Sequence, residues 1–211
     1  MTWRRSQVQI LSGSFTIMQA PYKSLTEIIE LIDEPNRTAC VRLVEENQHL
    51  LAQARGSKTK HQAWTGGYLD HVVEVSNIAA VFYDGLNAQR KLPFSLSDAL
   101  LVLFLHDIEK PWKHSAKTGS WKDTPRLDTK DKIRKFVERK IKQYGFQLTD
   151  EHRNGLKYVE GENKEYHPEI RVQGPLAAFA HLCDVTSARI WFDHPLQEND
   201  PWQGSKRSNP E

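Results

Sequence analysis

The stretch Leu101–Trp112 reads LVLFLHDIEKPW and is the most informative part of the chain, because a histidine and an aspartate directly follow five consecutive apolar residues. A helix that is apolar nearly all round is a buried helix. Ionisable groups at the end of a buried helix are costly unless they are paired or bound to a metal. His106 and Asp107 therefore indicate a buried helix that ends at a polar site, and a divalent cation is the simplest partner for both.

The composition indicates one soluble globular domain. The chain has 211 residues, of which 38% are hydrophobic and 27% charged, so it is long enough for a substantial core. Its longest apolar run, Ala99–Leu105, is too short to cross a bilayer. The two cysteines, Cys40 and Cys183, form no disulfide framework and lack metal-ligand spacing. We therefore expect a reduced, cytoplasmic setting and no membrane partner.

The remaining pattern predicts an all-α fold. Capping signals at Ser24 and at Ser95 or Ser97 precede apolar residues at helical spacing, a further helix starts near Thr149-Asp150, and no stretch alternates as a strand would. We expect Gly85 to end the third helix and Pro111 to block helical continuation, with 111–127 as a functional loop. The expected helices lie near 24–32, 38–54, 67–83, the run ending at 105, 128–144, 150 onward and 175–192.

The chain ends differ from this helical part. Residues 1–20 carry no helical periodicity and no apolar stretch of secretory length, so we expect a poorly ordered N-terminal extension. Residues 197–211 are polar and contain two prolines and a glycine, which predicts a flexible tail. The expected helical domain spans 21–196.

Candidate metal ligands occur on three separate apolar helices: His71, the His106-Asp107 pair and Asp184. Each has another interpretation when taken alone. A single histidine on an apolar face is more often a hydrogen-bonded core residue, and Asp184 could pair with Arg189. Glu74, three residues after His71, could be the structural partner of a histidine one turn away. Because three buried helices each contribute nitrogen or oxygen ligands, the joint pattern favours a shared cation.

In this order, H…HD…D, these residues resemble the HD-domain metal-dependent phosphohydrolase superfamily. HDIEKP is similar to that family's HDxGKP-like stretch, with Glu109 where many members have glycine. GGYLDHVVEV is similar to the GGLLEHTLxV segment around the family's first histidine. His61, in HQAWTGGYLDH, resembles the first histidine of the exoribonuclease-like branch. The resemblance covers roughly residues 50–195.

The resemblance implies an HD-domain helical bundle that holds a divalent metal ion with two imidazoles and two carboxylates. Mixed nitrogen and oxygen ligation suits Mn, Co, Fe, Ni or Zn, and Mg less readily. Such a metal polarises a phosphoester or phosphoanhydride bond and activates a water without a covalent intermediate. The catalytic residues expected from the resemblance are Asp107, Lys110 and His61.

Further side chains are candidates for binding the substrate. Lys110 follows the metal pair and could neutralise a phosphate, although a lysine at a helix C-terminus is also favoured by the helix dipole. Lys113 and His114 lie in the next loop and could contact phosphate. Trp64 offers a surface for base stacking, and Arg189 offers a further phosphate contact.

The charge distribution bears on the substrate. Residues 109–142 contain twelve Lys/Arg against five Asp/Glu, a positive field that attracts phosphates, although beyond Asp128 it could equally be a solvated helix face. We expect a nucleotide phosphohydrolase, of nucleotidase or nucleoside triphosphatase type, acting on a small phosphorylated substrate. The alternatives are a 3′-end nuclease on single-stranded nucleic acid and a non-catalytic nucleotide-binding module.

Overall fold

The computed structural model describes residues 21–113, 127–190 and 202. Within them the chain is helical, without a strand, so the predicted all-α fold is confirmed. The helices are α1 (Leu25–Glu30), α2 (Asn36–Gln53), α3 (Gly67–Gln89), α4 (Leu96–Leu105), α5 (Lys110–Lys113), α6 (Lys130–Tyr144), α7 (Asp150–Tyr158) and α8 (Pro175–Arg189), with a short 3₁₀ turn, η2, at Asn163–Glu165.

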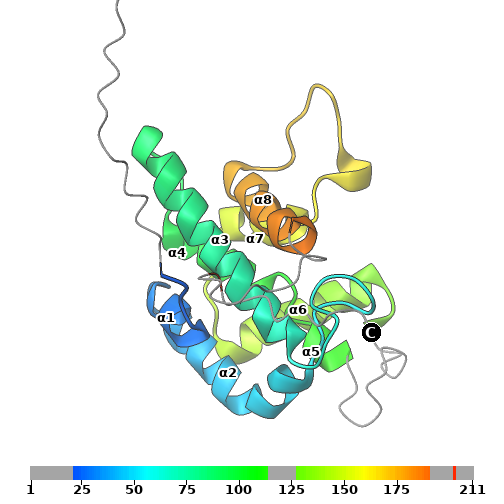
Figure 1. The fold of residues 1–211 in the computed structure, drawn as a ribbon. Helices are drawn as coiled ribbons and strands as arrows, with labels where there is room; N and C mark the ends of the chain where they lie inside the picture. The colour runs from blue at the N-terminus through cyan, green and yellow to red at the C-terminus, as the bar shows by residue number, and fades with distance from the viewer. Residues whose placement is uncertain (1–20, 114–126, 191–201, 203–211) are drawn as a thin grey trace, which may run out of the picture.

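Helix α3 is the central element of the molecule. It has 23 residues and runs diagonally through the fold, with α1 and α2 toward one end and α8 beside its middle (Figure 1). It packs against α1, α2, α4 and α8, while α7 packs against α8 and α4. The core therefore lies where α3, α4 and α8 meet, and any polar side chain pointing there is buried.

Helix α4 is buried along its length, as its sequence predicts. The side chain and backbone amide of Ser95 form a capping box with Asp98, which satisfies free backbone amides at the helix start. Every residue of Ala99–Leu105 is buried. Because α4 contacts α3, α7 and α8, it delivers the residues that follow it to the middle of the molecule.

Two predicted helix breaks are wrong. Helix α3 continues through Gly85 to Gln89, since a glycine costs an exposed helix only about 1 kcal/mol and a side chain there would meet nothing within 4 Å. Pro111, expected at the start of the loop 111–127, instead belongs to a helix, and residues 114–126 of that expected loop lie outside the described residues. It lies in the first turn of the short helix α5, where its missing N–H has no helical partner to lose.

Much of the predicted chain-end behaviour lies outside the described residues, which exclude 1–20, 191–201 and 203–211. Trp202, inside the predicted tail, is described, and its ring packs edge-on against Tyr22 at 5.0 Å. Among the helices that the structure describes, none is both long and apolar enough to cross a membrane.

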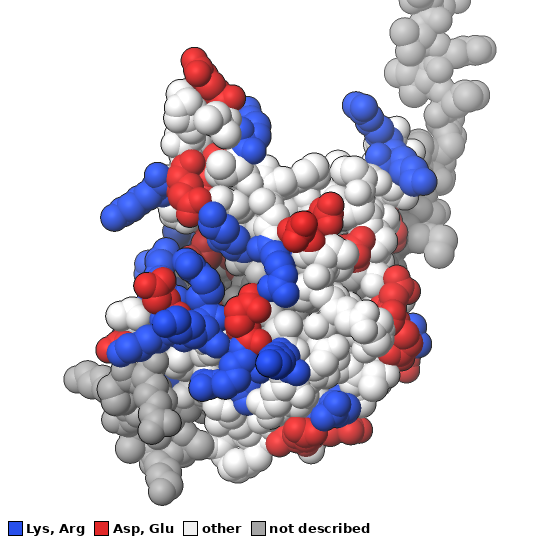
Figure 2. Space-filling model, turned by 180° about the vertical axis from the view of Figure 1, so that it is seen from behind, with Lys and Arg blue, Asp and Glu red and all other residues white. Residues whose placement is uncertain are grey.

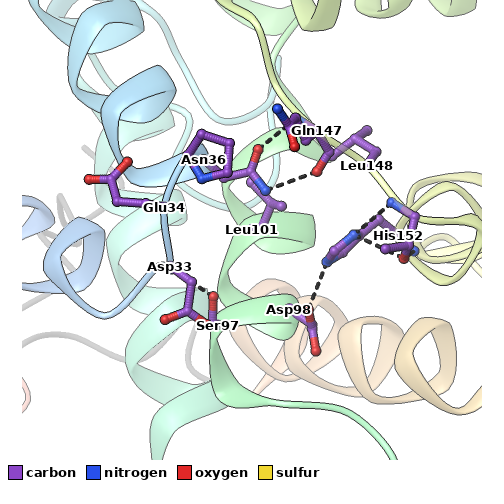
Figure 3. Close-up of a pocket in the computed structure, with 11 residues that line it drawn as sticks. Asp33, Glu34, Asn36, Ser97, Asp98, Leu101, Gln147, Leu148 and His152 are labelled. Carbon is purple, nitrogen blue, oxygen red and sulfur yellow. Dashed lines mark hydrogen bonds and ion pairs between the residues drawn. The ribbon is translucent and has the colours of Figure 1, made fainter.

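A cavity of about 400 Å³ lies between the α1–α2 turn, the start of α4 and the connection from α6 to α7 (Figure 3). Its wall includes Asp33, Ser97 and Asp98, and His152 of α7 donates to Asp98 across it, 3.0 Å from Nε2 to Oδ1. None of the predicted metal ligands lines this cavity.

Candidate metal centre

The four predicted ligands converge from three helices. His71 lies in the first half of α3, His106 caps the C-terminus of α4, Asp107 follows it, and Asp184 lies in α8. These helices pack against one another, so residues far apart in the sequence lie side by side in the core. His71 is fully buried, and the His106 side chain is 3% exposed.

Three of the ligands are spaced as a metal site requires. His71 Nε2 lies 3.3 Å from His106 Nε2, and Asp184 Oδ1 lies 3.2 Å from the former and 3.7 Å from the latter. Ligand atoms about 2.1 Å from one ion are roughly 3–4 Å apart, so these separations fit a shared cation. Among the described residues, His71, His106 and Asp184 form a group whose ligand atoms all lie within 4.8 Å.

Asp107 joins this group and is also bound by a lysine. Its Oδ2 lies 3.6 Å from His71 Nε2 and 3.2 Å from His106 Nε2. The same oxygen forms an ion pair with Lys110 Nζ. The sequence placed Lys110 just past the metal pair, and the structure brings its ammonium to the edge of the cluster.

The charges in the cluster stabilise one another. Burial disfavours each ionised form, but Asp107 and Asp184 outweigh it for His106 and raise the pKa of that imidazole well above its ordinary value. Burial raises the pKa of Asp184, but its contacts with His106 and His71 outweigh burial and lower that pKa well below its usual range. Burial is likewise outweighed at Lys110, whose pKa Asp107 raises. A cation bound here would take the place of the proton on His106 Nε2 and would compensate the same carboxylates.

The orientation of His106 is fixed by the backbone. Its Nδ1 lies 2.7 Å from the carbonyl oxygen of Leu103, which can only accept, so Nδ1 carries a proton. Nε2 therefore faces the cluster as the ring nitrogen available to a metal. A second contact of this kind, from His71 Nδ1 to Ser187 Oγ at 3.2 Å, lies behind the other imidazole.

His61 lies next to the cluster and has an open nitrogen. Its ring centroid is 5.1 Å from that of His71, and its buried Nε2 has no hydrogen-bond partner among the described residues. Burial, together with the charges of His71 and Lys110, lowers the pKa of His61 to about 4. The ring is thus neutral near pH 7 and can accept a hydrogen bond or a proton.

The other predicted substrate contacts are less closely tied to the cluster. Lys113 Nζ pairs with Glu109 Oε1 at 2.8 Å, and Trp64 Nε1 donates to Asp70 Oδ2 at 2.7 Å. Arg189 is exposed and lies about 140° around the helix from Asp184, so it does not pair with that carboxylate. His114 lies outside the described residues. Their substrate roles stay predictions.

The basic residues of α6 lie partly on the surface and partly inside. Figure 2 shows Lys and Arg gathered on one side of the molecule with acidic side chains between them. Lys132 pairs with Asp128 at 2.7 Å, which reduces the positive field. Lys140 is buried, with its ammonium 4.2 Å from the centre of the Trp112 ring, so α6 packs against the segment that follows His106 and Asp107.

Sequence reasoning did not identify two residues beside the cluster: Ser187, whose Oγ contacts His71 Nδ1, and Gln62, whose Nε2 donates to Glu74. Ser187 is one helical turn after Asp184, so a polar residue on the same face as a ligand was the available signal. Glu74 was expected to contact a histidine one turn away, and it reaches His71 through Ser187.

No protein-family model, curated protein or solved structure matches the chain. The relation to HD-domain hydrolases is therefore a proposal that depends on the sequence motifs and on the geometry of the cluster.

Proposed function

We propose that the chain is a metal-dependent phosphohydrolase of the HD-domain type, which hydrolyses phosphoester or phosphoanhydride bonds of small substrates, most favourably nucleotides. One observation carries the proposal. His71 Nε2, His106 Nε2 and Asp184 Oδ1 come from three helices and lie within one ligand sphere. A cluster of two imidazoles and a carboxylate inside an apolar core is costly unless something compensates its charge.

The donor set fits a divalent first-row metal. Two imidazole nitrogens with one or two carboxylates suit Mn, Co, Fe, Ni or Zn better than Mg. His61 Nε2, buried and without a partner in the described part of the chain, adds an unsatisfied polar atom on a ring whose centroid is 5.1 Å from that of His71. Bound there, such an ion would act as a Lewis acid toward a phosphoryl oxygen and lower the pKa of water.

The protein's own side chains supply the remaining steps. Lys110, held against Asp107, places an ammonium where it can neutralise a phosphate oxygen. His61, whose buried Nε2 has no hydrogen-bond partner in the described part of the chain, could accept a hydrogen bond from an attacking water and orient it. Because the cluster is largely buried, the charge of Lys110 acts in a low dielectric, where its attraction for a phosphate oxygen is stronger than in water.

A 3′-end nuclease on single-stranded nucleic acid is the second candidate. The exposed Lys130, Lys135, Arg139 and Lys142 of α6 favour it, since a helix that packs against Trp112 could hold a phosphate backbone near the cluster. A small nucleotide needs no such extended surface.

Substrate tests separate these functions. Protein freed of metal would be supplied with Mn²⁺, Co²⁺ or Zn²⁺ and assayed on nucleotides, a chromogenic phosphodiester and a labelled oligonucleotide. Phosphate or pyrophosphate release from nucleotides supports the proposal, and shortening of the oligonucleotide alone favours the nuclease. Absence of turnover with every metal and substrate would contradict both and favour a binding module.

The Asp184→Asn variant ties activity to the cluster. It keeps the size of the side chain but removes the charge that faces His71 and His106, so we expect loss of metal retention and at least about a hundredfold loss of turnover. Asp131→Asn, an exposed site on α6, is the matched control. If Asp184→Asn turns over substrate as the unmodified protein does, the assignment of the active site to this cluster is wrong.

A further inference from the structure

A chain of buried polar groups lies behind His71, on the side away from the other ligands. Ser187 Oγ is 3.2 Å from His71 Nδ1 and 2.8 Å from Glu74 Oε2. Gln62 Nε2 is 2.6 Å from the same Glu74 oxygen. Gln62, Glu74 and Ser187 are 4%, 0% and 1% exposed, so water does not compete for these contacts.

The directions of these hydrogen bonds follow from the chemistry of the groups. The amide nitrogen of Gln62 can only donate, so Glu74 Oε2 is an acceptor. Ser187 must then give its single proton to Glu74 and has only lone pairs left for His71. His71 Nδ1 must therefore be the donor to Ser187, and in a neutral imidazole this leaves the lone pair on Nε2.

We propose that Glu74 is a positioning residue that acts through Ser187 to keep the proton of His71 on Nδ1, so that Nε2 always presents its lone pair to the ligand cluster. A hydrogen bond at the far ring nitrogen of a histidine ligand fixes its tautomer and the orientation of its ring. The consequence for metal affinity rests on the proposed function, whereas the position of the proton does not.

Gln62 holds the carboxylate from the opposite side. Its loop is tight, because Gly56 N donates to Gln62 O at 2.9 Å and a methyl group on Gly67 would lie 2.0 Å from that oxygen. The same loop carries His61. Gln62 thereby links the loop that presents His61 to the carboxylate that orients His71.

The tautomer of His71 tests the proposal without any metal or substrate. Long-range proton–nitrogen spectra of the ¹⁵N-histidine-labelled, metal-free protein would locate the ring proton, with His71 assigned from its absence in His71→Asn. We expect it on Nδ1, and at least partly on Nε2 in Ser187→Ala. Ser76→Ala is the matched control, since Ser76 is equally buried but donates only to the Val72 carbonyl at 2.7 Å. A proton on Nε2 in the unmodified protein, or the same tautomer in Ser187→Ala, would overturn the proposal.

Metal affinity gives the second measurement. Calorimetric titration with Zn²⁺ should show a loss of roughly ten- to a hundredfold for Ser187→Ala and for Glu74→Gln. Ser76→Ala should change it less than about twofold, and Ser187→Thr, which retains a hydroxyl, should recover part of the loss. Unchanged Zn²⁺ affinity in both Ser187→Ala and Glu74→Gln would contradict the positioning role of Glu74 even if the protein hydrolyses nucleotides. The tautomer result in turn stands if no hydrolysis is found.

Discussion

At the residue scale, the role of Lys110 bears on whether the cluster holds a metal ion or is neutralised by ion pairs alone. Its ammonium contacts Asp107 at the edge of the cluster and so provides one positive charge without any ion. The remaining carboxylate, Asp184, faces the two imidazoles. If Lys110 serves the substrate, its removal harms catalysis and leaves the metal in place. If it serves the cluster, its removal disturbs the ligands themselves.

We expect Lys110→Ala to retain bound metal and to lower kcat by about a hundredfold, since it removes one preorganised positive charge from the phosphate position. Metal content would be measured by elemental analysis after gel filtration, and kcat with the substrate found by the assay above. Lys157→Ala, which removes an exposed ammonium paired with Glu165, is the control. Loss of metal from Lys110→Ala would assign the lysine to the structure of the cluster.

The residues that meet in the cluster could be predicted because each is an ionisable residue in, or directly after, an apolar helical stretch, a conflict visible in the sequence itself. That they bind a metal stays a prediction. His71, Asp107 and Asp184 all violate the pattern of their surroundings in this way. Ser187 could not be found by this criterion, because a buried serine is common and its role depends on which residues face it across two helices. Arg189, which the sequence offered as a partner of Asp184, does not pair with it, because a spacing of five residues places the two side chains on different faces of the helix.

At the element scale, α4 and α7 approach each other closely at a glycine. A methyl group added to Gly155 of α7 would lie 2.8 Å from Val102 Cγ2, and Val102 is fully buried. We expect Gly155→Ala to lower the free energy of unfolding by about 1–2 kcal/mol, because overpacking exceeds the gain in helix propensity. Urea denaturation measures the change.

The double variant Gly155→Ala with Val102→Ala identifies the cause of this loss. Removal of the two Val102 methyl groups makes room for the new one, so the double variant should be more stable than the two single effects predict, by about 1 kcal/mol. Strict additivity would show that the two side chains do not meet.

The cap of α4 gives stability that depends on pH. Burial raises the pKa of Asp98, but hydrogen bonds from Ser95 and the charge of His152 outweigh it, so the folded pKa lies below 3.8. A carboxyl with a depressed folded pKa stabilises the protein above its unfolded pKa, and this contribution is lost as the pH falls through the folded value. Asp98→Asn should therefore be less stable than the unmodified protein at pH 6, and the difference should shrink below pH 4. Urea unfolding of both proteins across this range tests it, and a difference that does not vary with pH would contradict the assignment.

Helix starts could be predicted from the sequence better than helix ends. Ser24, Ser95 and Thr149 each cap the helix that follows, since capping is a local contact between residues three apart. Gly85 and Pro111 were read as breaks because both disfavour a helix interior. Whether such a residue ends a helix depends on its place in the turn and on packing elsewhere, which a local pattern does not contain.

At the scale of the whole molecule, the cluster connects parts of the chain that only folding brings together. His71 and Asp184 are 113 residues apart, and the helices that carry them pack against each other and against the one that delivers His106. The all-α class could be predicted from composition and periodicity. That these three helices meet was predicted only because each carries candidate metal ligands. An unfolded chain cannot hold these groups within one ligand sphere, so an ion bound to the cluster binds the folded state alone.

We therefore expect metal to raise the thermal stability of the entire domain. At a free metal concentration 100 times Kd, selective binding to the folded state adds about 2.7 kcal/mol. In a chain of this size, that corresponds to a rise in Tm of roughly 5–10 °C. Calorimetric scans of chelator-treated protein with Mn²⁺, Co²⁺ or Zn²⁺ measure the rise, which should be absent in Asp184→Asn. Ca²⁺, which prefers oxygen ligands, should give little change and serves as the control for ionic strength. A Tm that does not respond to any of the three transition metals would show that the two imidazoles and Asp184 compensate one another without an ion, and the hydrolase proposal would lose its basis.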